Sequence, residues 1–310
     1  MGGSGRPPSP PGARRAPGDP GHSSIHSQTV TASLREPASL RVGRDGRLGL
    51  RFERRGAKTI LAHGAYTLPL QVLTPVRLDD PAAVVSVLNP TGGLLGGDRL
   101  SIEVAVGRDA HACLTTPSAT RVYRTNGPAA EQNVHVRVDS GGRLEWLPDH
   151  AIPSAGAAFR QRIDVDMAPD ARLILVDGFA AGRVARGEAW QFASLESAVT
   201  VREGRRFILH DRFVLRAGGA WTALGCADGH PYFGSVFVMG PGDLAPLARA
   251  MTAALGAADA VGGAAPGARG GLVARVLAPS APALLGALDA LSALARRTVM
   301  GLPPLGLRKY

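Results

Sequence analysis

Apolar and polar residues alternate with a period of two along much of the chain. Valines occupy every second position of residues 133–139, and residues 162–167 repeat the pattern with Ile163, Val165 and Met167. Such alternation is typical of a β-strand that buries one face. Further strand-like runs follow at short intervals, separated by turn residues: 48–52, 65–70, 82–88, 101–106, 143–147, 173–176, 198–201, 207–215 and 272–277. The spacing predicts a mainly β fold, a large body of short strands with antiparallel neighbours.

Two segments near the C-terminal end follow a helical period instead. One runs from Asp243 to Ala257, with Asp243 able to cap its first turn. The other runs from Ser280 to Arg297, with Ser280 as the N-cap. We expect these residues to face inward: Leu244, Leu247, Ala248, Met251 and Leu255 in the first helix, and Leu284, Leu285, Leu288, Leu291 and Leu294 in the second. Between the helices, the glycine-rich residues 262–267 predict a loop.

The N-terminal segment differs in composition from the rest of the chain. Residues 1–28 are rich in proline, glycine, serine and arginine and lack an apolar run, so they cannot offset the entropy of ordering. We predict a disordered tail over residues 1–28 and a single domain over residues 29–310. We expect no secretory signal and no membrane span, because no uninterrupted apolar run is long enough.

Positive charge dominates the chain, which carries a net charge of +10. Part of it gathers early in the sequence, at Arg35, Arg41, Arg44, Arg47, Arg51, Arg54 and Arg55. This cluster fits a surface for an acidic partner protein or a solvated basic face. Few aromatic residues lie among the arginines, so we expect no nucleic-acid partner. A basic nucleic-acid-binding β module is the alternative, and a steep fall of affinity with salt would reveal it.

Cysteine usage and the lack of catalytic motifs limit the function further. Cys113 and Cys226 lie far apart in unlike contexts, which favours a reduced, cytoplasmic protein. Cys226-x-x-x-His230 has a metal-like spacing, but we interpret it as a turn with a buried cysteine. Neither G-x-S-x-G nor H-E-x-x-H occurs, so we expect no enzymatic activity. A metal-dependent hydrolase is a second alternative, which would retain stoichiometric metal after dialysis and turn over a model substrate.

A glycine-rich connection, Asn89–Leu100, joins the strands predicted at 82–88 and 101–106. Its glycines have P-loop spacing, but Asp98 stands where a P-loop has lysine, and a strand follows instead of a helix. We therefore assign a structural role to Gly92, Gly93, Gly96, Gly97 and Asp98. The glycines let the backbone bend, and Asp98 is expected to accept backbone N–H bonds.

Several strings of residues follow one another in the order that one protein family has them. They are Pro90-Thr91-Gly92-Gly93-Leu94-Leu95-Gly96-Gly97-Asp98, Thr115-Thr116-Pro117-Ser118-Ala119-Thr120-Arg121-Val122-Tyr123-Arg124, Glu145-Trp146-Leu147-Pro148, Gly182-Arg183-Val184-Ala185-Arg186-Gly187-Glu188 and Gly229-His230-Pro231. In these strings the chain resembles the UreD family of urease accessory proteins, also called UreH. The resemblance implies a β-helix-like, mostly antiparallel fold with two helices and no catalytic turnover. It also implies a cytoplasmic scaffold that binds urease apoprotein and, with the accessory proteins UreF and UreG, supports nickel insertion.

Four residues are candidates for a path along which nickel would pass: Glu145, Asp149, His150 and Asp177. Weak carboxylate and imidazole contacts would let the ion exchange without being trapped, so we expect transient nickel and no tightly bound cofactor. A salt bridge is the alternative role for each residue. His150 stands where UreD-like chains usually have a carboxylate, which puts its part in the path in question. The hydroxyl residues Thr115, Thr116, Ser118 and Thr120 could line a polar groove or lie in a strand with satisfied hydroxyls.

Overall fold

A computed structural model describes residues 2–3, 45–75 and 78–307. The chain divides into two units, Met1–Arg35 and Glu36–Tyr310, and every helix and strand described below lies in the second. Apart from Gly2 and Gly3, the tail predicted over residues 1–28 lies outside the described residues.

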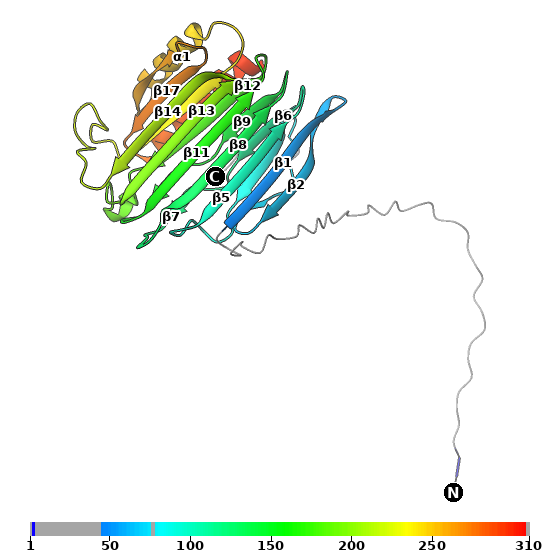
Figure 1. Cartoon of the computed structure of the whole chain (residues 1–310), viewed down its shortest axis with the longest axis horizontal. Coiled ribbons are helices and arrows are strands. Elements are labelled where there is room, and N and C mark those ends of the chain that lie inside the picture. Colours follow the sequence, from blue (N-terminus) through cyan, green and yellow to red (C-terminus); the bar gives the residue numbers. More distant parts are fainter. Residues whose placement is uncertain (1, 4–44, 76–77, 308–310) are drawn as a thin grey trace. The chain divides into compact units, whose positions relative to one another are not determined.

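Two β-sheets form the body of the second unit (Figure 1). Across sheet 1 the strands are β14 (Arg206–Arg216), β13 (Ser194–Glu203), β11 (Ala158–Met167), β8 (Ala130–Val138), β5 (Arg99–Val106), β1 (Asp45–Arg55) and β2 (Lys58–Thr67). Across sheet 2 they are β16 (Val261–Pro266), β17 (Leu272–Ala278), β15 (Tyr232–Met239), β12 (Arg172–Ala180), β9 (Arg143–Leu147), β6 (His111–Thr115), β4 (Ala83–Leu88) and β3 (Gln71–Val72). The short strands β10 (Ala151–Pro153) and β7 (Thr120–Val122) join sheet 2 through β12.

The chain coils between the two sheets like a β-helix. From β4 to β13 the long strands alternate between sheet 2 and sheet 1, in the order β4, β5, β6, β8, β9, β11, β12 and β13. Strands that are one turn apart in the coil therefore pair in parallel, as β8 does with β5 before it and with β11 after it. The β-helix-like part of the fold expectation is confirmed.

The expectation of antiparallel neighbours is wrong for the centre of both sheets. Antiparallel pairs occur towards the edges, as between β1 and β2 or β13 and β14, while the pairs between successive turns are parallel. Alternation of apolar and polar residues shows that one face of a strand is buried, but it does not show the direction of the neighbouring strand. Parallel strands need a long crossover, and here the crossover is the strand of the opposite sheet.

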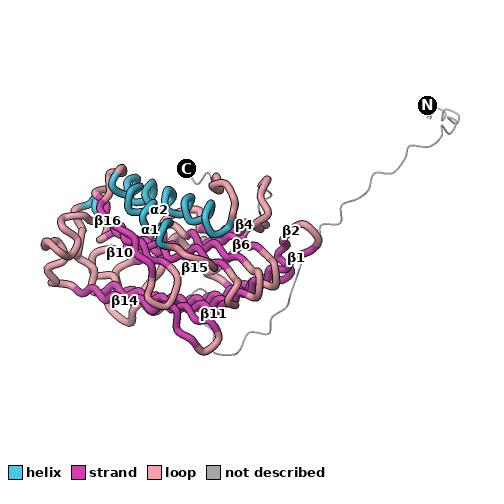
Figure 2. Tube along the Cα trace, turned by 90° about the horizontal axis from the view of Figure 1, so that it is seen from above, coloured by secondary structure: helices cyan, strands magenta, loops and turns pink. Residues whose placement is uncertain are grey.

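Three layers follow from which faces are buried. The side chains between the sheets form the main core, which includes Val134, Val136 and Val138 of β8. The other face of sheet 2 packs against the helices, so β12 is buried along nearly its whole length. The outer face of sheet 1 is not covered in the same way: His135 and Arg137, which alternate with the buried valines, are exposed. Figure 2 shows both helices on the sheet 2 side of the body.

Both predicted helices form close to their expected bounds. Helix α1 is Ala245–Gly256, and the N–H of Ala245 donates to Asp243 Oδ1 (2.9 Å). Helix α2 is Ala281–Ala295, and the Ser280 hydroxyl caps it by accepting from the N–H of Ala283. A π-helical turn, Arg296–Met300, continues α2, and a 3₁₀ turn, Val184–Arg186, follows β12. Among the described residues, no helix is both long and apolar enough to cross a bilayer.

The structure differs from the sequence-based expectations in three details. Residues 262–267 do not form a loop, because β16 spans Val261–Pro266 and pairs with β17. Helix α2 buries Ala287 and Ala295, while Leu285 and Leu294 are only half-buried, since the buried stripe lies slightly to one side of the leucine stripe. Cys226 is exposed.

The glycine-rich connection packs its backbone tightly against the next turn of the coil. A Cβ on Gly93 would lie 2.6 Å from the carbonyl oxygen of Arg121, and one on Gly96 would lie 1.9 Å from Thr125 Oγ1. Asp98 is buried, and its Oδ2 accepts from the N–H of Leu95 (2.7 Å). The sequence of small residues is thus needed for close contact between successive turns, and the buried carboxylate holds the bend.

Replacing Gly96 by alanine tests this close contact. The added methyl group has no room beside Thr125, so we expect Gly96→Ala to lower the free energy of unfolding by about 2 kcal/mol. Gly127→Ala is the matched control, because nothing lies within 4 Å of its Cβ position and its φ is not positive. Urea denaturation of both variants measures the difference, and equal stability would contradict the tight packing.

Candidate functional site

Four polar side chains meet in the otherwise apolar interior between the sheets. Gln132, Gln161 and Ser197 come from β8, β11 and β13 of sheet 1, and Asp177 comes from β12 of sheet 2. Gln132 Nε2 donates to Gln161 Oε1 (2.9 Å), and Gln161 Nε2 donates to Asp177 Oδ1 (2.8 Å). The hydroxyl of Ser197 donates to Asp177 Oδ2 (2.8 Å). Both carboxylate oxygens of Asp177 therefore accept hydrogen bonds from neutral groups.

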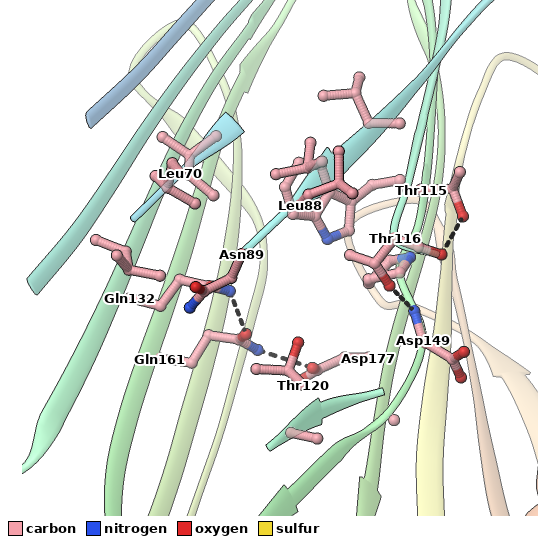
Figure 3. A pocket seen from close by; sticks show the side chains of 18 of the residues that line it. Leu70, Leu88, Asn89, Thr115, Thr116, Thr120, Gln132, Asp149, Gln161 and Asp177 are labelled. Carbon is pink, nitrogen blue, oxygen red and sulfur yellow. Dashed lines mark hydrogen bonds between the residues drawn. The ribbon is translucent and has the colours of Figure 1, made fainter. Parts of the chain in front are cut away.

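This cluster borders a cavity of about 70 Å³ (Figure 3). Its apolar wall includes Leu100, Trp146 and Phe159. The polar groups that line it are Asn89, Thr115, Thr116, Thr120, Gln132, Asp149, Gln161 and Asp177. The three threonines thus line a polar space, whereas Ser118 is exposed and does not border the cavity. Thr115 Oγ1 donates to Leu147 O (2.8 Å), and Thr116 Oγ1 accepts from the N–H of Asp149. Most of the oxygen atoms around the cavity belong to neutral groups.

Burial changes the proton affinity of Asp177. Removal from water raises its pKa from 3.8 to about 6, while the hydrogen bonds from Ser197 and Gln161 act in the opposite direction. The charge of Asp211 raises the pKa further by a smaller amount. Asp177 therefore gains or loses its proton close to neutral pH.

Asp149 and His150 lie in the connection that follows β9. The N–H of Asp149 donates to Thr116 Oγ1 (2.8 Å), which ties this connection to the end of β6. Asp149 Oδ1 lies 3.2 Å from His150 Nδ1 and accepts from the N–H of His150 (3.1 Å). The His150 ring packs edge-on against Tyr232, with 6.1 Å between the ring centroids. The side chains of Asp149 and His150 are both buried, and the Asp149 carboxylate orients the imidazole of His150.

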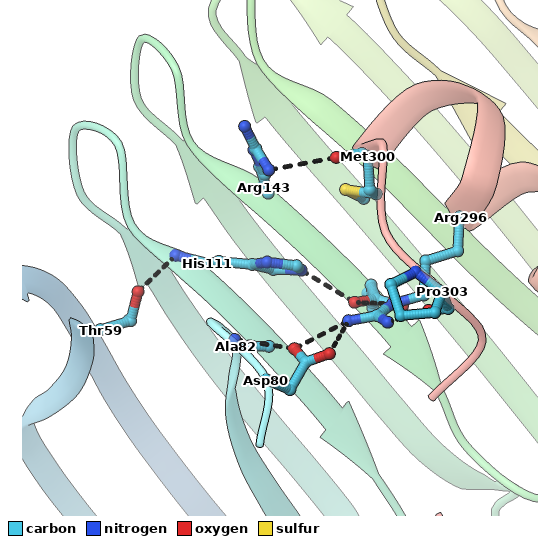
Figure 4. A network of polar contacts seen from close by, with 9 residues as sticks. Thr59, Asp80, Ala82, His111, Arg143, Arg296, Met300 and Pro303 are labelled. Carbon is cyan, nitrogen blue, oxygen red and sulfur yellow. Dashed lines mark hydrogen bonds and ion pairs between the residues drawn. The ribbon is translucent and has the colours of Figure 1, made fainter. Parts of the chain in front are cut away.

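A second buried cluster surrounds Arg296, on the face of sheet 2 that the helices cover (Figure 4). Arg296 Nε lies 3.0 Å from both carboxylate oxygens of Glu145, and Nη2 lies 2.8 and 2.7 Å from those of Asp80. Arg296 Nη1 donates to the carbonyl of Pro303. His111 Nε2 lies 2.8 Å from Glu145 Oε1. Burial acts to lower the pKa of Arg296, but Glu145 and Asp80 outweigh it, so the pKa lies above its ordinary value.

The two clusters lie on opposite faces of sheet 2. Asp177 shares its face with Leu175 and Phe179, which belong to the core between the sheets. Glu145 alternates with Leu144 and Trp146 of that core, so its side chain points the other way, towards α2. Glu145 lines a groove of about 510 Å³ between α2 and residues 304–307. Pro148 lines both this groove and the cavity between the sheets, so the end of β9 separates the two spaces.

Comparison with known proteins identifies the family. The model of the family described as UreD urease accessory protein matches residues 44–309. The chain belongs to the UreD family of urease accessory proteins. The "Urease accessory protein UreD" of Deinococcus radiodurans is 37% identical over 281 residues, which cover 89% of this chain and 99% of the relative. Proteins with the same name from Sorangium cellulosum and an Arthrobacter species are 39% identical over 210 residues and 34% over 275, covering 65% and 86% of this chain and 67% and 94% of the relatives.

In this UreD-family structure, the four predicted path residues do not form one cluster. Asp149 and Asp177 line the cavity between the sheets, whereas Glu145 belongs to the Arg296 cluster. His150 lies close to the helix side, because a Cβ on Gly178 would be 3.3 Å from His150 Cβ and 3.4 Å from Leu288 of α2. Across residues 2–3, 45–75 and 78–307, no three His, Cys, Asp or Glu side chains are placed to hold a metal ion together.

The hydrogen-bond and ion-pair partners of these residues were not predicted from the sequence, although some of them occupy positions that indicate a buried polar group. Gln132, Gln161 and Ser197 occupy positions where the period-two pattern requires an apolar residue facing the core. A polar residue at such a position must find a buried partner. Arg296 likewise continues the series Leu284, Leu288 and Ser292 at intervals of four on α2. Neither pattern says which acid is the partner, since Asp80 lies 216 residues from Arg296.

Replacing Arg296 tests how much the buried ion pairs contribute to stability. Arg296→Ala would leave two buried carboxylates without their cation, so we expect the free energy of unfolding to fall by about 3–5 kcal/mol. Arg297→Ala is the matched control: it removes the neighbouring, exposed arginine and should change stability by less than about 0.5 kcal/mol. Urea denaturation gives both values. Similar small losses in the two variants would show that the buried ion pairs contribute little.

The raised pKa of Asp177 makes the stability of the chain depend on pH. Because the pKa of Asp177 is higher in the folded chain than in the unfolded one, its contribution to stability is complete below about pH 4 and is lost as the pH rises through about 6. The full effect is roughly 3 kcal/mol. We expect the free energy of unfolding of Asp177→Asn to fall less than that of the unchanged chain between pH 4 and pH 7. Parallel pH profiles of the two proteins would contradict the raised pKa.

Proposed function

We propose that this chain is a urease maturation scaffold without catalytic turnover. In this proposal it binds urease apoprotein in the cytoplasm and, together with UreF and UreG, supports nickel insertion into the urease active site. Membership of the UreD family supports the role, since the match spans nearly all of the chain after residue 44. Nickel is cargo in this scheme, so the chain needs no resident metal and no tightly bound cofactor.

The cavity bordered by Asp177 is the observation that carries the nickel part of the proposal. Carboxylate, hydroxyl and amide oxygens are weak ligands for a borderline cation, and such ligands exchange readily. Asp177 adds a proton-linked step: because burial raises its pKa to about 6, a proton competes with an arriving cation as the pH falls towards 6. Each of these features favours brief residence over firm binding.

Within the proposed path, the four residues differ in what they offer to the cargo. Asp149 and Asp177 border the cavity, and Asp177 has no cationic hydrogen-bond partner. Glu145 is already paired with Arg296, and it lines the groove on the other face of the sheet. His150 lies beside Asp149, where its imidazole could accept the ion. We propose that Asp149 and Asp177 contact nickel directly. Glu145 and His150 lie near the end of β9, where the proposed path leaves the cavity between the sheets.

Urease activation in cells tests the proposal. We expect cells with the urease structural subunits and the other accessory proteins to contain nickel-poor, inactive urease unless this chain is present. Asp177→Asn keeps the size of the side chain and removes its charge, so it should lower the urease activity and nickel content towards the level without the chain. Asp259→Asn, at an exposed aspartate outside both clusters, is the control and should activate fully. Activation that is indifferent to the chain would overturn the maturation role, and full activation by Asp177→Asn would overturn the path.

A further inference from the structure

A row of basic side chains crosses the helix-facing side of sheet 2. His111, Arg143 and Arg172 stand at the starts of β6, β9 and β12, and the register of these parallel strands places them directly beside one another. All three have the parity of Glu145 and Ile174, whose side chains lie on the face covered by the helices. Like charges on neighbouring positions of a sheet are destabilising. The row therefore requires compensation by negative charge.

The Glu145 carboxylate lies against His111, but among the described residues no carboxylate forms an ion pair with the two arginines of the row. Arg54, at the end of β1, approaches from sheet 1, and no ion pair is formed by Arg54, Arg143 or Arg172 with a described residue. The pKa of Arg143 is lowered by burial and then by the charges of Arg172 and Arg54, while Asp109 opposes them with a smaller effect. Positive charge thus accumulates at this end of the strands.

These basic residues surround an open space. A cavity of about 460 Å³ is lined by Arg54, Asp109, His111 and Arg143 and by the turn residues Gly56 and Gly141. Asp109 is the single acid among the residues that line it. Nothing lies within 4 Å of the Cβ position of Gly56, whereas the Asp109 carboxylate occupies the space beside Gly141. A small ligand could therefore approach the arginines from the Gly56 side.

His111 provides an independent sign that a partner is missing. Its Nε2 must donate to the Glu145 carboxylate, which can only accept, and its backbone N–H donates to Thr59 Oγ1 (2.8 Å) (Figure 4). Its Nδ1 is the one buried side-chain nitrogen or oxygen atom in the described residues that has no hydrogen-bond partner. Native structures rarely leave such an atom unpaired.

The arginines still have donors to offer. Arg143 uses Nη1 to cap the end of the helix by donating to the carbonyl of Met300 (3.2 Å). Arg54 uses Nε to donate to Gly56 O (2.6 Å). A guanidinium carries five N–H groups, so each residue keeps donors for a ligand, in a fork that matches an oxyanion.

We propose that the pocket formed by Arg54, His111 and Arg143 binds an oxyanion, either a free phosphate-like ion or a carboxylate of a partner protein. The ligand neutralises the basic row and sits between the guanidinium groups of Arg54 and Arg143. This site is separate from the cavity around Asp177, which lies on the other face of sheet 2. It therefore stands or falls independently of the maturation role.

Calorimetric titration of the purified full-length chain with inorganic phosphate tests the site, at constant ionic strength with chloride as the comparison. We expect saturable phosphate binding that weakens about tenfold in Arg54→Gln, since one charge-assisted contact is lost. Arg162→Gln is the control: it removes an exposed arginine of sheet 1 that forms no ion pair with a described residue, and it should leave affinity unchanged. Arg54 is itself exposed, so its replacement should not prevent folding.

A second titration, with a hexaglutamate peptide, distinguishes the sources of the oxyanion. Binding of phosphate that depends on Arg54 assigns a free ion. Binding of the peptide alone, with the same dependence on Arg54, assigns a carboxylate of a protein partner. If neither ligand saturates, or if Arg54→Gln and Arg162→Gln weaken binding equally, the pocket is not a site. None of these measurements involves urease, so a failure here leaves the proposed function untouched.

Discussion

Most strands of sheet 2 are covered on both faces, and this constraint governs the rest of the structure. Its inner face meets sheet 1, and its outer face meets α1, α2 and the segment after Met300. A polar side chain in the covered part of such a sheet cannot be solvated, so it must find a partner inside the protein. Sheet 2 buries two acidic side chains, Asp177 and Glu145, and each has a different kind of partner.

On the inner face, Asp177 is held only by neutral donors. Their hydrogen bonds do not offset its removal from water, and the carboxyl group binds its proton more tightly than in the unfolded chain. On the outer face, Glu145 receives a guanidinium from the end of α2, and Asp80 shares the same cation. The ion pairs also fix the chain beyond the helix, because Arg296 holds the carbonyl of Pro303. Asp177 can thus exchange a proton or a cation, while Glu145 links α2 to the sheet through its ion pair with Arg296.

Particular residues show how far the sequence could predict this arrangement. The valines of β8, the Ser280 cap and the glycine-rich connection are local signals, and the elements formed there as the local pattern predicts. Strand direction depends on which strands become neighbours, and Val134 would face the core equally well in an antiparallel sheet. The Arg296 cluster joins residues 80, 145 and 296, so no spacing in the sequence could reveal it. The polar residues at inward positions, Gln161 above all, were the detectable sign of the inner cluster.

The different partners of Asp177 and Glu145 affect how well each carboxylate could take part in the proposed nickel path. A carboxylate that already shares a guanidinium can accept a cation only if the ion pair breaks, and breaking a buried pair costs about 3–5 kcal/mol. Glu145 is therefore poorly suited to rapid exchange while Arg296 stays in place. Asp177 would lose only hydrogen bonds from neutral groups, because with a pKa of about 6 it is mostly ionised at neutral pH. A path that must release its ion as readily as it accepts it is better served by the inner face, where the carboxylate has no competing positive charge as a hydrogen-bond partner.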